Sequence, residues 1–191
     1  MLAIPAQMGY LALAALIFGE CAGLPIPGET ALIVAGGLAA SGQLSLVLVI
    51  VVAATAAALG DNAGYWIGRR GGRKLLTREG FGAAHRRAAV ARADRFFARY
   101  GVGTVFLGRW IVGVRYLAAV MAGATHMPYR RFVVANALGA VAWAGSVATV
   151  ARAAGPTGSL ALIAVSASIG LISLVLAHLR RRRAGSPVTV P

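Results

Sequence analysis

The stretch from Phe106 to Met127, FLGRWIVGVRYLAAVMAGATHM, decides the fold, because it reads as a membrane segment and yet carries Arg109 and Arg115. On an insertion scale, an Arg at mid-bilayer costs roughly 2.5 to 3.5 kcal/mol, whereas each Leu, Ile, Phe or Val returns only about 0.3 to 0.6 kcal/mol. The two arginines therefore outweigh the strongly apolar residues around them. We expect this segment to be enclosed by protein or to line a wet cavity, with acidic or phosphate partners for its arginines.

The chain has only five acidic residues that can act as such partners. Two of them, Glu20 and Glu29, lie in the other apolar stretch that is interrupted by charge, and they are the natural counterparts of Arg109 and Arg115. Because charges inside a membrane are functional by default, we interpret these four residues as a site for substrate binding and proton coupling. The alternative interpretation is a structural cluster of salt bridges.

The overall composition is that of a polytopic membrane protein. The 191 residues are 59% hydrophobic and only 13% charged, which is far from the average of soluble proteins. The net charge of +14 is divided among short segments between apolar stretches, as the positive-inside rule requires, so a nucleic-acid partner is not expected. Cys21 is the only cysteine, which excludes an intrachain disulfide and a cysteine metal cluster. We expect neither a metal nor a cofactor.

The apolar run that follows the first helix is interrupted by helix-breaking residues. Pro25, Pro27 and Gly28 stand in the middle of this run, and two prolines so close together cannot both lie inside a regular helix. We therefore predict a broken, re-entrant hairpin at about 20–42, with its second arm beginning between Pro27 and Thr30.

The segment 44–67 is long enough to span a membrane. Asp61 and Asn62 lie in its final third and are secondary candidates for the functional site. They can equally pack against glycines or cap the end of the span. Tyr65 and Trp66 come next, and we expect both at the membrane interface.

A strongly basic segment follows at about 69–100. Within it, residues 88–100 place apolar side chains on one face and arginines opposite, which is typical of an amphipathic helix lying on an anionic leaflet. A solvated helix packed on the rest of the protein is the alternative. Two further apolar stretches, 132–151 and 159–179, complete the membrane domain, and 184–191 is expected to be a disordered tail.

The distribution of positive charge predicts the topology. If the second arginine-bearing segment, at about 104–127, crossed the membrane fully, the basic segment and the arginines at 180–183 would lie on opposite sides. If it enters and returns, both are cytoplasmic, as the positive-inside rule favours. We therefore predict an all-α, polytopic integral membrane protein with one domain over 1–183 and two oppositely oriented re-entrant hairpins. The similarity of FGE at 18–20 to FLGR at 106–109 indicates an inverted repeat.

Three ordered blocks resemble the signature of a known family: GLPIPGE at 23–29, GDNAGYWIGRRGG at 60–72 and GRWIVGVR at 108–115. These blocks resemble those of the DedA family, whose shared region is also called the SNARE-associated or VTT domain, and the resemblance covers roughly 18–150. It implies a bacterial inner-membrane protein with two facing re-entrant hairpins. Bacterial members are linked to undecaprenyl-phosphate recycling, envelope integrity and resistance that depends on the proton-motive force, and eukaryotic relatives to phospholipid scrambling.

The resemblance also assigns individual residues. Glu20 and Glu29 fall on the paired acidic positions of the family, and Arg109 and Arg115 fall on its paired arginines. Where relatives usually carry a proline in the second hairpin this chain has a valine, so Gly113 alone must break that hairpin.

From these features we expect a transporter that moves a phosphate-bearing lipid, either undecaprenyl phosphate or a phospholipid, across the bilayer. A guanidinium presents a bidentate fork to phosphate oxygens, and a desolvated carboxylate that loses its cationic partner can take up a proton. Competition between phosphate and carboxylate for the same arginines would couple transport to protons, with passive scrambling as the other option. Membrane lipids and protons are the expected partners, and a homo-oligomer is compatible with the sequence.

Two other functional classes remain as alternatives. A proton-dependent antiporter of small ions or drugs would use the same set of charges. An intramembrane lipid phosphatase would need a histidine nucleophile together with a second histidine or an aspartate. Three scattered histidines do not supply this arrangement, so we expect no enzyme activity and no catalytic residues.

Overall fold

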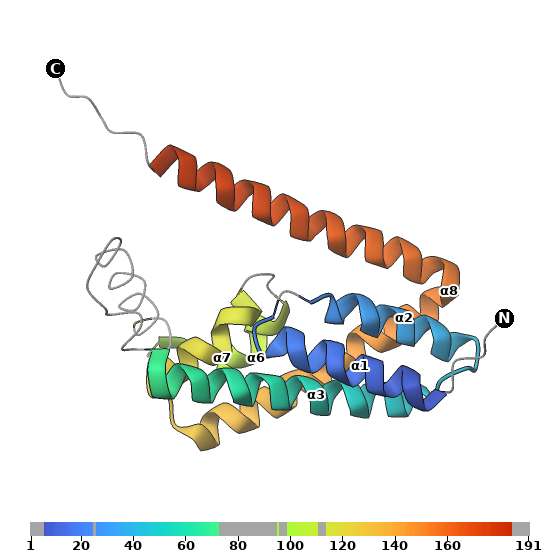
Figure 1. The fold of residues 1–191 in the computed structure, drawn as a ribbon, viewed down its shortest axis with the longest axis horizontal. Helices are drawn as coiled ribbons and strands as arrows, with labels where there is room; N and C mark the ends of the chain where they lie inside the picture. The colour runs from blue at the N-terminus through green and yellow to red at the C-terminus, as the bar shows by residue number, and fades with distance from the viewer. Residues whose placement is uncertain (1–5, 25, 73–94, 96–98, 111–113, 185–191) are drawn as a thin grey trace.

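All regular elements in the described part of the chain are helices, which confirms the predicted all-α class (Figure 1). The computed structural model describes residues 6–24, 26–72, 95, 99–110 and 114–184, and of these it describes only the backbone at 114–117 and 169–184. The predictions for Pro25 and Gly113, for most of the basic segment and for the tail lie outside the described residues.

Two short apolar helices begin the fold and pack side by side. Helix α1 spans Ala6–Cys21 and α2 spans Gly28–Ala40. The interruption between them coincides with the prolines, and α2 begins within the predicted range. With 16 and 13 residues, neither helix reaches the roughly 20 residues that a membrane crossing needs.

Helix α3 spans Leu46–Ile67 and continues into a π-helical turn, η1, at Gly68–Gly72. The 22 residues of α3 rise roughly 33 Å, about the thickness of the hydrocarbon core. Together with most of η1 it forms one of the two helices in the described part of the chain that are long and apolar enough to cross a membrane. The predicted span at 44–67 is therefore confirmed as a continuous helix.

The segment with Arg109 is divided into short pieces. Helix α6 spans Val102–Leu107, a 3-10 turn, η2, covers Gly108–Trp110, and α7 spans Val114–Ala124. A long uninterrupted helix therefore does not run through this part of the chain.

The last element, α8, spans Tyr129–Ala184 and contains a sharp break. Gly155 has φ 71° and ψ −179°, which favour glycine, and Pro156 follows it. Figure 1 shows the chain reversing direction at this break. The hydroxyl of Ser159 contacts both sides of the break, at 2.8 Å from the carbonyl oxygen of Gly155 and 3.2 Å from that of Ala151. The second apolar helix long enough for a membrane span is the part at Tyr129–Ser168.

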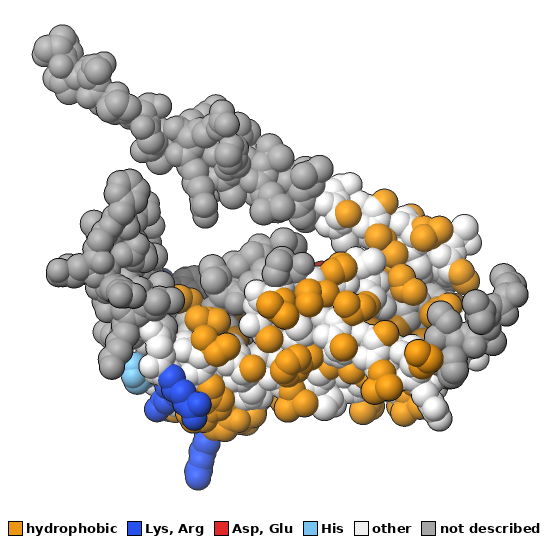
Figure 2. Space-filling view, in the orientation of Figure 1, with side chains coloured by type: hydrophobic (Ala, Val, Ile, Leu, Met, Phe, Trp, Pro, Cys, Tyr) orange, Lys and Arg blue, Asp and Glu red, His pale blue; other side chains and the backbone are white. Residues whose placement is uncertain are grey.

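The outer surface is apolar, whereas the interior is built largely from small residues. Figure 2 shows hydrophobic side chains covering most of the visible described surface. Leu11, Val47 and Leu160 are each about two-thirds exposed, as expected for side chains that face lipid. Helix α1 packs on α3, and α2 and α3 both pack on the first part of α8. The buried residues of this core include many alanines, which allow close helix packing in membranes.

Glycines bring α3 and α7 into backbone contact. A Cβ atom added at Gly68 would overlap the backbone carbonyl of Val120, and one added at Gly123 would overlap the backbone carbonyl of Tyr65. Tyr65, which we expect at the membrane interface, is buried against protein: its ring stacks on Phe132. The close approach of the two helices therefore depends on the absence of side chains at Gly68 and Gly123.

We predict that Gly123→Ala lowers the thermal stability of the purified protein in detergent. The added methyl group forces α3 and α7 apart, and such overpacking typically costs about 1 to 3 kcal/mol. The matched control is Gly145→Ala in α8, because no atom lies within 4 Å of the added Cβ there and alanine favours the helix. Equal melting temperatures for the two variants would contradict the close contact of α3 with α7.

Candidate functional site

The short turn η2 places Arg109 in the interior of the protein. The side chain is only 6% exposed, although it carries a permanent charge. Gly139 of α8 makes room for it: a Cβ added at Gly139 would lie 3.2 Å from Cδ and 3.4 Å from Nε of Arg109. A larger residue at this position would press on the guanidinium.

Two polar side chains from two different helices hold this guanidinium. Nη2 of Arg109 donates a hydrogen bond to Oδ2 of Asp61 on α3, with which it forms an ion pair, and another of 2.5 Å to Oδ1 of Asn136 on α8. Asn136 is completely buried, and its Nδ2 donates to the carbonyl of Ala58 at 3.0 Å. That bond orients the amide so that its oxygen faces Arg109. The turn η2 and the helices α3 and α8 therefore meet at one charged contact.

Two buried polar atoms in this region make no hydrogen bond to a described residue. The Nε atom of Arg109 and the Oδ1 atom of Asn62 are buried and have no hydrogen-bond partner among the described residues. Asn62 lies close to Asn136, because its Nδ2 atom donates to the same Ala58 carbonyl at 2.8 Å. Buried polar groups are normally satisfied by protein, water or ligand. The N–H group at Nε of Arg109 is therefore a buried cationic donor without a partner in the described part of the chain.

The predicted acidic residues lie at the interruption between α1 and α2. Glu20, at the end of α1, is buried, and Glu29 is half-buried in the first turn of α2. Gly28 accommodates the Glu20 carboxylate, since a Cβ at Gly28 would come within 2.5 Å of its Oε2 atom. The end of α1 also touches α3 at Gly60, the residue before Asp61.

Of the predicted set, the structure shows Arg109 in contact with an acid, and that acid is Asp61. Sequence analysis had placed Asp61 second to Glu20 and Glu29. Arg115 lies in α7, which contacts α1, and its side chain is outside the described residues. Each prediction about what these residues bind stays a prediction.

Sequence reasoning missed Asn136 and Gly139. The available signal was a single amide side chain inside the apolar run at 132–151, since polar residues within membrane segments are rare and tend to face the protein interior. It could not show which of the other segments Asn136 would contact.

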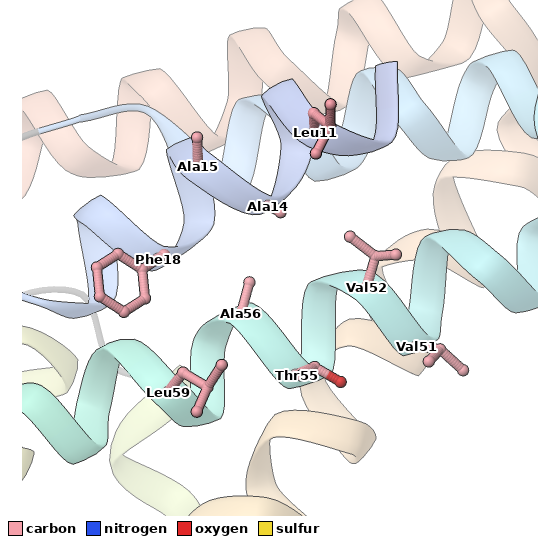
Figure 3. A pocket seen from close by; sticks show the side chains of 9 residues that line it. All are labelled: Leu11, Ala14, Ala15, Phe18, Val51, Val52, Thr55, Ala56 and Leu59. Carbon is pink, nitrogen blue, oxygen red and sulfur yellow. The ribbon is translucent and has the colours of Figure 1, made fainter. Parts of the chain in front are cut away.

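A separate apolar groove runs between α1 and α3 (Figure 3). It has a volume of about 540 Å³, and its lining is hydrophobic except for the hydroxyl of Thr55. The lining residues are Leu11, Ala14, Ala15, Phe18, Val51, Val52, Thr55, Ala56 and Leu59. Since none of these is charged, the groove is not part of the Arg109 site.

Comparison with known proteins shows that the segment with the Arg109 site matches a known domain family. Residues 26–153 match the model of the VTT domain, a range that contains Asp61, Arg109 and Asn136. No solved structure matches the chain significantly.

Several relatives are described as membrane proteins. The chain is 37% identical to an uncharacterized membrane protein of Synechocystis sp. over 181 residues, which are 88% of this chain and 82% of that protein. It is 41% identical over 160 residues to an uncharacterized membrane protein of Mycobacterium tuberculosis, covering 80% of this chain and 72% of that protein. It is also 35% identical to protein DedA of Escherichia coli over 120 residues, which are 62% of this chain and 54% of that protein. The extent of the domain match and these relatives together show that the chain belongs to the DedA family of VTT-domain membrane proteins.

Proposed function

We propose that this protein moves a phosphate-bearing lipid, either undecaprenyl phosphate or a phospholipid, across a bacterial inner membrane, and that Arg109 binds the phosphate. The observation that carries the proposal is a buried guanidinium whose Nη2 atom is held by Asp61 and Asn136 while its Nε atom has no partner among the described residues. Guanidinium groups bind phosphate through pairs of parallel hydrogen bonds. In this proposal, the N–H group at Nε of Arg109 forms one bond of such a pair.

The same contact suggests how binding is coupled to protons. A phosphate that approaches Arg109 competes with the carboxylate of Asp61 for the same cation. A buried carboxylate that loses its cationic partner is stabilised by taking up a proton. Asp61 would thus join Glu20 and Glu29 as a candidate for proton transfer.

The broken helices support a membrane path for the lipid headgroup. We propose that the break between α1 and α2 and the 3-10 turn η2 mark the tips of two re-entrant hairpins in an inverted repeat, one entered from each side of the membrane. Helices α1, α2 and α7 are all too short to cross alone, and Glu20 and Arg109 lie next to these interruptions. The positive-inside rule places the basic loop and the C-terminus in the cytoplasm.

Purified protein in liposomes tests the proposal directly. The assay follows a fluorescent phospholipid, or labelled undecaprenyl phosphate, between leaflets and measures inorganic phosphate at the same time. Lipid exchange without phosphate release is expected. Phosphate release would favour the phosphatase alternative, and uptake of cations driven by a pH gradient without lipid exchange would favour the antiporter.

We predict that Arg109→Lys reduces the rate of lipid exchange at least tenfold while the protein still folds. Lysine keeps the charge but cannot form the fork that phosphate binding requires. The matched control is Arg152→Lys, because Arg152 is exposed and lies far from the site on α8. Wild-type exchange by Arg109→Lys, measured in the same liposomes, would end the assignment of Arg109 as the phosphate-binding group.

We predict that replacing the ion pair by two apolar residues separates stability from transport. Asp61→Leu alone leaves a buried, unpaired guanidinium and should destabilise the protein by about 3 to 5 kcal/mol, whereas the double variant Asp61→Leu/Arg109→Met should recover much of that loss. Transport should stay absent in the double variant. If the stable double variant still exchanges lipid, the pair is only a structural salt bridge.

We predict that lipid binding is accompanied by proton uptake. Adding a soluble short-chain phosphate lipid to the protein in weakly buffered detergent should raise the pH of the solution, because displaced carboxylates bind protons. Asp61→Asn should take up fewer protons per bound lipid than the wild type. Equal uptake by both proteins would exclude Asp61 as a proton acceptor, and its absence in both would favour passive scrambling.

A further inference from the structure

Four aromatic side chains connect the end of α3 to the beginning of α8. The rings of Tyr65 and Phe132 stack with their centroids 4.5 Å apart. Tyr129 lies 5.5 Å from Tyr65 and 5.6 Å from Trp66, again between ring centroids. Trp66 and Tyr129 are each 40% exposed, whereas the other two rings are buried. This end of the molecule therefore has a rigid aromatic base with two rings at the surface.

Arg69 and Arg70 contact these aromatic side chains. Nη1 of Arg69 donates to Oη of Tyr65 at 2.7 Å and approaches the carbonyl of Met127 at 3.4 Å, while the Tyr65 hydroxyl donates to that same carbonyl at 2.6 Å. The guanidinium of Arg70 lies 5.5 Å from the centroid of the Trp66 ring. Both arginines are exposed, so the N–H groups that these contacts do not use face the surroundings.

Two more arginines stand beside them. Arg130 and Arg131 follow Tyr129 in the first turn of α8 and are exposed. Figure 2 shows basic side chains gathered at one end of the visible surface, with apolar side chains over the rest. Among the described residues, none of the four arginines forms an ion pair. The helix N-terminus adds partial positive charge at the same place.

We propose that this arginine–aromatic end, formed by Arg69, Arg70, Arg130 and Arg131 with Trp66 and Tyr129, docks the headgroup phosphate of an anionic phospholipid. Charge complementarity identifies the partner: a cluster of cations that forms no ion pair with a described residue, at the end of an otherwise apolar surface, meets the membrane where phosphates lie. Exposed Trp and Tyr side chains favour the headgroup level of the membrane, because each combines an apolar ring with a polar N–H or O–H group.

This docking surface is distinct from the proposed transport site. Asp61 precedes Arg69 by eight residues on one helical stretch, so the buried Asp61–Arg109 pair lies roughly 12 Å deeper along the axis. A headgroup phosphate held by these surface arginines does not reach that pair. Headgroup docking at this surface therefore does not depend on transport through the Arg109 site.

The test compares lipid retention by purified full-length protein in native mass spectrometry, with phosphatidylglycerol and phosphatidylcholine supplied in equal amounts. The wild type should retain phosphatidylglycerol preferentially. The triple variant Arg70→Gln/Arg130→Gln/Arg131→Gln should retain it much less, since each surface arginine contributes about 1 kcal/mol, or roughly a fivefold change in affinity. Arg69 is left unchanged because it also contacts Tyr65 and Met127.

Arg152→Gln is the matched control, because it removes one exposed arginine from the opposite end of the first part of α8. It should retain phosphatidylglycerol like the wild type. Equal retention by the wild type and the triple variant would overturn the proposal, as would equal retention of the two lipids by the wild type. Either result would leave the lipid-exchange assay, and thus the proposed function, unaffected.

Discussion

The ion pair between Arg109 and Asp61 is the constraint on which the centre of this protein depends. A guanidinium cannot lose its proton, so its burial must be compensated by an anion and by hydrogen bonds. Asp61 supplies the charge and Asn136 supplies a second acceptor. Because these residues come from α3 and α8, the compensation also determines which helices lie next to η2. The need to compensate the buried charge of Arg109 thereby fixes the relative position of η2, α3 and α8.

Glycines make this arrangement sterically possible. Gly60, Gly64 and Gly68 recur every four residues and so lie along one side of α3 and η1, where the end of α1 and then α7 approach closely. Asp61 projects from a different side, toward Arg109. On α8, Gly139 leaves space for the side chain of Arg109. The small residues thus bring the helices close enough for short polar side chains such as Asp and Asn to meet.

The elements of the fold could be predicted from the sequence, whereas the contacts between them could not. Apolar length gave the long helix at 44–67, and the prolines gave the interruption before Gly28. Both signals are local, because they depend on hydropathy and on the backbone geometry of proline. The acid that pairs with Arg109 depends on which helix faces which, and periodicity along one helix carries no such information. Tyr65 illustrates the same limit, since a tyrosine near a helix end suits either an interface or a buried contact.

Charge balance is the basis for the proposal that the Arg109 site is more than a structural contact. Among the described residues, Arg109 and Asp61 form an ion pair in an apolar interior. Adding a phosphate brings a second anion to the same cation, and an excess charge in a medium of low polarity is costly. The excess can be removed in three ways: the carboxylate takes up a proton, a second cation such as Arg115 approaches, or the phosphate leaves. The first route links the lipid to protons, the second permits passive scrambling, and the third returns the headgroup to the membrane surface. A transporter needs the third step as much as the binding step. In the proposed mechanism, the carboxylate of Asp61 provides this step when it pairs with Arg109 again and displaces the phosphate.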